Sequence, residues 1–155
     1  MAIAALDLGR RRIGLAIADD DGLAVHPIGA LERRSTVRDL ELIRTRLTEY
    51  EVSRVVVGLP LNMDGSAGPA ALAAQAFAER LSESSGLPVD LFDERLTSFE
   101  AETRLREMSS GQSDGTRNKT RNKSKSDRDK GMIDAVAASI ILEGWLIQRR
   151  SNQAT

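Results

Sequence analysis

The sequence predicts an α/β domain built on a mixed five-stranded sheet, with its first three strands antiparallel and helices flanking it. Three observations support this fold class. The chain has 155 residues, which suits one domain with one sizeable core, and 41% of them are apolar, as in globular proteins. Three runs of strand-forming residues come first, and helical segments then alternate with two further runs.

The first three strands are expected near the N-terminus. An apolar run over 2–6 predicts a buried strand, and the alternating residues of 12–18 predict a second one. The basic turn 9–12 would join the two as a hairpin. A third strand is expected over 23–31, where Pro27 favours an edge or a bulge because proline has no N–H to donate. The alternating apolar residues of the second strand are Ile13, Leu15 and Ile17.

Two helices are expected next, on either side of a β-branched strand at 54–59. Apolar residues at helical spacing predict a helix over 36–50, and the Ala-rich segment 70–84 predicts another. Gly86 would end this second helix, and residues 88–92 would form the last strand. The expected core-facing residues are Val37, Leu40, Ile43 and Leu47 in the first helix and Leu72, Ala76, Phe77 and Leu81 in the second.

Two more helices are expected in the C-terminal third. Thr97 and Glu100 fit a capping box for a helix over 98–108, because the two side chains can satisfy each other's backbone N–H groups. Helical spacing predicts a final helix over 130–149. The expected apolar face of this final helix consists of Ile133, Val136, Ala137, Ile140 and Ile141.

The charge is distributed unevenly. Residues 110–130 carry seven Lys or Arg against three Asp, a net charge of +4, so the rest of the chain is net −5. We predict a single domain over 1–150, with a flexible basic loop at 109–130 and a disordered tail at 151–155. The loop would either add salt-dependent affinity for nucleic acid, independent of sequence, or be a tolerated surface insertion.

The composition excludes several kinds of site. The chain has no cysteine, so a disulfide scaffold, a thiolate zinc site and a cysteine nucleophile are ruled out, and the lone His26 rules out a pair of imidazole ligands. Aromatics make up 3% of the chain, which argues against a protein that binds by stacking bases on aromatic platforms. With no recognisable signal peptide and no long apolar span, we expect a soluble cytoplasmic protein with no membrane contact.

Three carboxylates stand where strands end or a helix begins. Asp7 ends the first strand, Glu94 follows the last one, and Asp134 lies in the first turns of the final helix. Ligands of such sheets bind beyond the strand ends, so the three would converge if the first and fourth strands are neighbours. Converging carboxylates repel unless a cation joins them, and all-oxygen ligands favour Mg²⁺ or Mn²⁺. Two such ions would activate water against a phosphodiester.

Each carboxylate also has an ordinary structural explanation. Asp7 fits a strand-end turn, Glu94 a solvated loop, and Asp134 a favourable acid near a helix N-terminus. The same strand turn occurs in ATP-binding proteins of the actin and sugar-kinase type. Those proteins need two such domains, and 155 residues leave room for one.

Four motifs in order resemble the YqgF family, also called the RuvX or Holliday-junction-resolvase-like family. The resemblance runs from residue 3 to about residue 148, and implies a ribonuclease H-like fold and a nuclease acting on the 5′ end of pre-16S ribosomal RNA. The basic loop is longer and more polar than the short link expected in the family. The motifs are LDLGRRRIGLA (6–16), VVGLPLNMDGSAGPAA (56–71), PVDLFDERLTSFEAE (88–102) and KGMIDAVAASIIL (130–142).

The resemblance assigns Asp7, Glu94 and Asp134 as the catalytic and metal-binding acids, with Asp93 as an alternative ligand to Glu94. It also places Arg12 and the loop over 60–69 near the substrate. The loop residues concerned are Asn62, Asp64, Gly65 and Ser66.

Two features of these motifs remain open to different explanations. The backbone N–H groups of Gly65 and Ser66, just before a helix, would suit a phosphate. Alternatively, Ser66 or Asp64 would simply cap that helix. Arg95 and Lys130 would contact either a phosphate or a carboxylate.

Two other functions stay open beside an RNA nuclease. A resolvase of branched DNA cuts two symmetry-related strands and so needs a dimer, for which Phe99 and Trp145 are the candidate contacts. A non-catalytic ribosome-assembly or transcription factor would bind RNA through the same groove. The expected partners are therefore pre-rRNA or branched DNA, and the expected state is a monomer or a weak homodimer.

Overall fold

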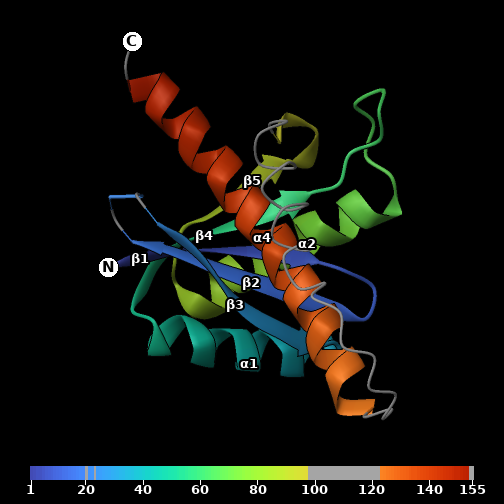
Figure 1. Ribbon diagram of the computed structural model, residues 1–155. Coiled ribbons are helices and arrows are strands. Elements are labelled where there is room, and N and C mark those ends of the chain that lie inside the picture. The colour runs from blue at the N-terminus through green and yellow to red at the C-terminus, as the bar shows by residue number, and fades with distance from the viewer. Residues whose placement is uncertain (20, 23, 98–122, 154–155) are drawn as a thin grey trace, which may run out of the picture.

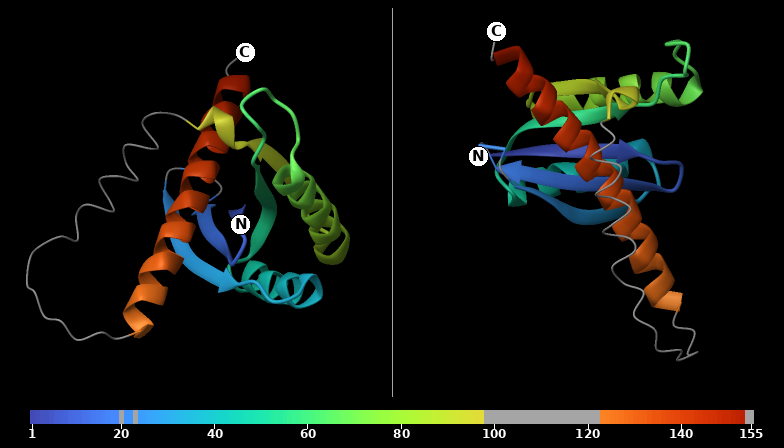
Figure 2. Two further views of the ribbon diagram at one scale, coloured as in Figure 1. Left: turned by 90° about the vertical axis from the view of Figure 1, so that its right-hand side faces the viewer. Right: turned by 45° about the horizontal axis from the view of Figure 1, so that its top comes forward.

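The computed structural model describes residues 1–19, 21–22, 24–97 and 123–153, with the side chains of 123–129 excepted. The strands form one five-stranded sheet in the order β3-β2-β1-β4-β5 (Figure 1). Helices α1 and α2 lie on one side of this sheet and α4 lies on the other (Figure 2). The predicted α/β fold class, with helices flanking a mixed sheet, is confirmed.

The three N-terminal strands are antiparallel and the other two run parallel to β1. Strands β1 (Ala2–Leu8), β2 (Arg12–Asp19) and β3 (Val25–Glu32) form the antiparallel part. Strand β4 (Val52–Leu59) pairs with β1, and β5 (Val89–Asp93) pairs with β4. The sheet therefore changes from antiparallel to parallel pairing at β1, as predicted from the order of the elements.

Pro27 occupies the position that its chemistry requires. It lies on the edge strand β3, opposite Ala16, where the pairing of β2 and β3 shifts register. An edge strand tolerates proline because the missing N–H has no ladder partner on the outer side. Both parts of the expectation for Pro27, an edge and a bulge, are confirmed.

Helices α1 (Thr36–Glu49) and α2 (Pro69–Ser85) cover one face of the sheet. Ser35 caps α1 by accepting a hydrogen bond from the backbone N–H of Arg38. Gly86 ends α2 at a φ of +71°, a left-handed conformation that favours glycine. The largest fully buried side chains between these helices and the sheet are Leu6, Ile13, Ile43, Leu81, Val55 and Val57.

Helix α4 (Lys123–Gln153) crosses the opposite face diagonally and closes a second core (Figure 2). Its approach is unusually close because small residues face it from the sheet. A Cβ added at Gly14 of β2 would lie 2.0 Å from the carbonyl oxygen of Asp134, so the helix backbone occupies that space. The buried residues of this core are Ile3, Ala5, Ala16, Ala18, Val56, Phe92, Ala138, Ile141, Leu142 and Leu146.

The predicted limits of the final helix were wrong at both ends. Helix α4 begins at Lys123 and continues to Gln153, so residues 123–130 are helical rather than part of a loop, and 151–153 are helical rather than a tail. The rest of the expected basic loop and the expected helix at 98–108 lie outside the residues that the structure describes.

The predicted buried faces of the helices were partly wrong. Four residues expected to face the core are exposed. They are Ile133 of α4 (60%), Val37 of α1 (68%), Leu72 of α2 (55%) and Ala76 of α2. Alanines take the positions against the sheet instead: Ala71, Ala74 and Ala78 in α2, and Ala135 and Ala138 in α4. Close approach of a helix backbone to a sheet selects small side chains and rotates larger ones outward.

One segment of α4, Lys130–Gln153, is long and apolar enough to cross a membrane when judged by length and composition alone, which the sequence analysis did not expect of any segment. Its buried residues pack on the sheet, and the core helix of a soluble protein meets the same criterion. With 39% of the segment buried, length and composition are weak evidence for a membrane span.

Candidate functional site

Three carboxylates lie at the edge of the sheet where β1 and β5 end, and their charges interact in pairs. Asp7 follows Ile3 and Ala5 at two-residue intervals on β1, which puts it on the α4 side of the sheet. Glu94 begins the short helix η1 (Glu94–Leu96) directly after β5, and Asp134 lies on α4. The sequence analysis expected these acids at the end of the first strand, after the last strand and on the final helix, and they lie on those elements.

The pKa shifts of two acids show how these charges are arranged. Burial raises the pKa of Asp7, and the nearby charge of Asp134 raises it further. Burial also raises the pKa of Glu94 to about 7, with further contributions from the charges of Asp7 and Asp93. The charge of Asp134 thus acts on Asp7, and the charge of Asp7 acts on Glu94. Asp7 therefore lies between the other two acids.

Gly58 makes room for Glu94 on the neighbouring strand. A Cβ at Gly58 of β4 would lie 2.5 Å from Oε1 of Glu94 and 2.6 Å from Cδ1 of Ile141. The Glu94 carboxylate thus lies directly over the backbone of β4, beside α4. Gly14 does the same for α4 itself, and sequence reasoning missed both residues. Glycine inside a strand pattern is the signal that points to such close approaches.

Arg12 is paired with one of the three acids. Its Nε donates to Oδ2 of Asp134 over 2.9 Å, and the two side chains are 21% and 32% exposed. Within the described parts of the chain, no three Asp, Glu or His side chains lie close enough together to hold a metal ion as they are placed. Arg12 was expected near the substrate, which stays a prediction; in the structure it contacts Asp134 at the same edge.

Asp93 and Glu94 are adjacent but differ in their surroundings. Asp93 accepts hydrogen bonds from the guanidinium of Arg95 at 2.8 Å and 3.1 Å and from its backbone N–H at 3.0 Å. These bonds lower the pKa of Asp93. Glu94 has its carbonyl oxygen bonded to Thr97 and its carboxylate turned toward Gly58. Asp93 is thus committed to Arg95, while Glu94 joins the acidic group.

The loop before α2 forms its own internal network. Asp64 Oδ1 accepts from the backbone N–H of Ser66 at 2.9 Å and from its hydroxyl at 2.6 Å, and Asn62 donates to that hydroxyl at 3.0 Å. The N–H of Gly65, at a φ of +87°, donates to the carbonyl of Asn62. Both backbone N–H groups expected to meet a phosphate are therefore already used within the loop.

The alternative role for this loop, capping of α2 by Ser66 or Asp64, was wrong. The N-cap is Gly68, which makes no side-chain hydrogen bond, and Pro69 follows it as the first helical residue. Proline at that position needs no partner because its missing N–H is one that helices leave unpaired. The loop is instead linked to the acidic edge by Arg95, whose Nη1 donates to the carbonyl of Met63 at 3.3 Å.

Several exposed cations lie on the turn after β1 and on the part of α4 that precedes Asp134. Arg10 and Arg11 are exposed in the turn between β1 and β2, and Lys130 is exposed on α4 one turn before Asp134. Arg33, which sequence reasoning missed, donates to the carbonyl of Gly9 at 2.9 Å and so supports this turn. The run of three arginines after Gly9 was the available signal for a basic surface beside the acids.

Comparison of the sequence with known proteins supports the resemblance noted above. The model of the RuvX family, described as Holliday junction resolvase, matches residues 1–148. A protein of Anaeromyxobacter sp. (strain Fw109-5), named "Putative pre-16S rRNA nuclease", is 48% identical over 147 residues, 94% of this chain and 96% of its own length. A Myxococcus xanthus (strain DK1622) protein of the same name is 42% identical over 145 residues, covering 94% and 87%.

Solved structures share the fold at low sequence identity. Thermus thermophilus RuvC in complex with a Holliday junction substrate matches with a TM-score of 0.61 and 16% identity, over 98% of this chain and 96% of that one. The fowlpox virus resolvase in complex with Holliday junction DNA matches with a TM-score of 0.56 and 14% identity, over 96% and 99%. The expected ribonuclease H-like fold is thereby confirmed.

Proposed function

This chain belongs to the RuvX family, described as Holliday junction resolvase, and from this premise we propose that it is a metal-dependent nuclease that hydrolyses phosphodiester bonds. The observation that carries the proposal is that the charge of Asp134 acts on Asp7 and the charge of Asp7 acts on Glu94, at one edge of the sheet. The substrate we propose is the 5′ end of pre-16S rRNA, after the names of the curated relatives. The place of action we propose is the cytoplasm.

The residues at this edge suit a hard divalent cation. Asp7 and Glu94 both have raised pKa values because burial and like charges oppose their ionisation, and a cation would relieve both effects. All three donors are carboxylate oxygens, which favours Mg²⁺ or Mn²⁺. Asp7, Glu94 and Asp134 would hold one or two such ions once Arg12 releases Asp134 and the three side chains move closer together than they lie in this structure. When bound, the metal supplies an activated water and stabilises the charge that develops on the phosphate.

The chain's own residues have separate tasks in this proposal. Arg12 neutralises Asp134 until a cation replaces it, and its guanidinium is then available to a phosphate oxygen at the same edge. Arg95 binds the Asp93 carboxylate and ties the loop before α2 to the end of β5. The exposed cations of the β1–β2 turn, Arg10 and Arg11, would contact the phosphates of the strand without reading its sequence.

A second candidate is the cleavage of branched DNA. The description of the family and the fold shared with RuvC favour it. Such a reaction requires two active sites related by symmetry, and hence a dimer. Cleavage at an RNA end needs one active site, so a monomer or a weak homodimer is sufficient. A non-catalytic RNA-binding factor would have no use for an edge at which burial and neighbouring charges raise the pKa values of both Asp7 and Glu94.

The test is a nuclease assay with Mn²⁺ and with Mg²⁺ on two substrates, a pre-16S rRNA fragment and a four-way DNA junction. We expect Asp7→Asn and Asp134→Asn to lose at least about 100-fold in rate, since even the partners that orient metal ligands are worth about 10- to 100-fold. Glu83→Gln, on the exposed side of α2, is the matched control. Full activity of both Asn variants would show that the site is wrong.

A further inference from the structure

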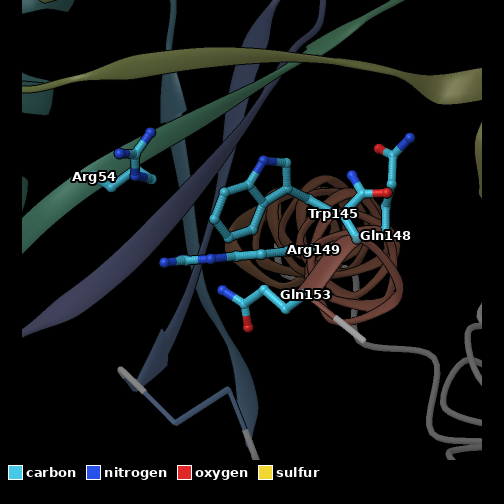
Figure 3. A pocket seen from close by; sticks show the side chains of 6 residues that line it. Arg54, Trp145, Gln148, Arg149 and Gln153 are labelled. Atoms are coloured by element: carbon cyan, nitrogen blue, oxygen red, sulfur yellow. The ribbon is translucent and has the colours of Figure 1, made fainter. Parts of the chain in front are cut away.

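A hollow of about 350 Å³ lies beside the C-terminal half of α4, away from the acidic edge (Figure 3). The side chains of Trp145 and Arg149 extend from α4 toward the strands, and Arg54 reaches the same space from β4 (Figure 3). Residues 54, 56 and 58 share the α4 side of β4, so this hollow and the Glu94 carboxylate lie on one face of the sheet. The lining residues are Arg54, Trp145, Gln148, Arg149, Asn152 and Gln153.

The lining combines an aromatic ring with guanidinium and amide groups. The guanidinium carbon of Arg149 lies 5.1 Å from the centroid of the Trp145 ring. Arg54 donates to Asp90 over 2.7 Å, which engages one of the five N–H groups that a guanidinium carries. Indole faces accept bases, guanidinium groups accept phosphate oxygens, and amides both donate and accept at base edges. The chemistry of the hollow therefore matches a nucleotide.

We propose that this hollow is a second contact for the nucleic-acid strand, with a base against Trp145 and a phosphate between Arg149 and Arg54. It is one contact with a single aromatic residue, so it agrees with the low aromatic content of the chain, which argued only against extended stacking platforms. The proposal rests on the proposed function in one respect, that the strand in the hollow is the one cut at the acidic edge.

The geometry of α4 gives the spacing between the two contacts. Trp145 lies eleven residues beyond Asp134, which at 1.5 Å per residue is about 16 Å, and Arg149 lies about 22 Å beyond it. Eleven residues at 3.6 per turn also return to nearly the same side of a helix. For a strand with the rise of a duplex, about 3.4 Å per nucleotide, the hollow would receive the nucleotide about five or six positions from the bond that is cut.

A contact with a second copy of the chain is the competing explanation for an aromatic residue at this surface. Tryptophan and arginine are both enriched at protein–protein interfaces, so Trp145 and Arg149 alone do not separate the two explanations. The lining as a whole has two guanidinium groups and three amide side chains and no carboxylate. A negatively charged ligand accounts for that lining and a symmetric copy of it does not, because two copies would bring the arginines together.

The binding test uses the only tryptophan of the chain, Trp145, as its probe. The full chain carrying Asp7→Asn is titrated, without divalent metal, with a 12-nucleotide single-stranded RNA while tryptophan fluorescence is recorded. We expect quenching that weakens with salt. Arg149→Gln should weaken binding roughly tenfold and lower the slope of log K against log salt by about 0.7. Arg80→Gln, an exposed arginine on α2, should change neither quantity.

The cleavage test uses the chain without the Asp7 change. Arg149→Gln should slow cleavage of a substrate that extends eight nucleotides from the cut toward the hollow, and leave unchanged a substrate that extends three. The proposal would be overturned if RNA did not quench the fluorescence, or if it quenched the Arg149→Gln variant equally. A fluorescence change that depends on protein concentration in the absence of RNA would report self-association and would also overturn it. If the chain cuts neither substrate, the fluorescence titration still tests RNA binding in the hollow. Failure of the proposed nuclease function can therefore be told apart from failure of the proposed contact.

Discussion

Arg12, the first residue of β2, donates from Nε to Oδ2 of Asp134 on α4 over 2.9 Å, joining residues 122 positions apart in the chain. The pair holds the helix over the sheet at the edge where β1 ends, next to Asp7. It also balances a charge, because Asp134 raises the pKa of Asp7 and Arg12 offsets the same carboxylate. One ion pair thus fixes α4 and engages an acid that the proposed metal requires.

Replacement of Arg12 by glutamine should have opposite effects on stability and on metal binding. The metal-free protein should lose about 1 kcal/mol, the usual net worth of a hydrogen bond within a protein. The affinity for Mn²⁺ should rise several-fold, because a competing cation has left Asp134. Thermal unfolding with and without Mn²⁺, together with calorimetric titration, measures both effects. Weaker Mn²⁺ binding in Arg12→Gln, with Arg80→Gln unchanged, would contradict this account.

The stability of the metal-free protein should depend on pH through Glu94. Its pKa rises from an ordinary value of 4.5 to about 7 on folding, so the folded state binds the proton more tightly than the unfolded state does. The resulting stabilisation is complete below about pH 4.5 and is lost as the pH rises through about 7. Glu94→Gln has no such proton to lose.

Melting temperatures of the wild type and Glu94→Gln, measured from pH 4.5 to 8 in a chelating buffer, test this dependence. The wild type should become progressively less stable than the variant as the pH rises. Mg²⁺ added at pH 8 should restore much of the difference, because a cation replaces the proton as partner of the carboxylate. A difference that stays constant with pH would refute the expectation.

The sheet could be predicted from the sequence because its signals are local. Apolar runs and alternation mark each strand, and Asp7 and Glu94 follow directly from where the strands end. The buried face of α4 is different, because contacts across the sheet decide it. Gly14 admits the helix backbone so closely that alanines fill the interface and Ile133 turns outward, and no local pattern around Ile133 contains that information.

The same distinction applies within the site. The position of Asp134 on a helix could be predicted, but its pairing with Arg12 depends on how two distant elements meet. The Gly65-Ser66 sequence suggested amides open to a phosphate, whereas Asp64 and Asn62 compete for them locally. Side chains that hydrogen-bond to their own loop are a frequent reason why a motif alone does not give the structure of a binding loop.

Gly14→Ala should destabilise the protein strongly. The added Cβ would lie 2.0 Å from the carbonyl oxygen of Asp134, and backbone cannot yield as a flexible side chain can. Overpacking of this kind costs about 1–3 kcal/mol, and occasionally more. Chemical denaturation measures the loss. Gly131→Ala is the matched control on α4, since its Cβ would meet only the Ala30 side chain at 3.7 Å.

This control should be stabilising by up to about 1 kcal/mol, because alanine is favoured over glycine inside a helix. Gly14→Ala should also lose nuclease activity under conditions where it remains folded, because α4 carries Asp134 and must move. Equal stability of the two variants would mean that α4 does not lie against β2 as described.

Asp93→Asn and Glu94→Gln should separate the roles of two adjacent acids. Asp93 is held by Arg95 through its side chain and backbone, while Glu94 lies over Gly58 among the other acids. We therefore expect Asp93→Asn to keep activity within about tenfold of the wild type, since an exposed ion pair is worth at most about 1 kcal/mol. Glu94→Gln should lose at least about 100-fold, as expected for a lost metal ligand.

Cleavage rates measured over a range of Mn²⁺ concentrations distinguish the possible causes of a loss. If Glu94 is a ligand, excess Mn²⁺ should partly rescue Glu94→Gln and should do nothing for Asp93→Asn, whose small defect lies in the position of the loop tied by Arg95. The reverse pattern, with rescue of Asp93→Asn by metal, would reassign the ligand to Asp93. It would then require Arg95 to release Asp93 before metal binds, because one carboxylate oxygen pair cannot satisfy both partners.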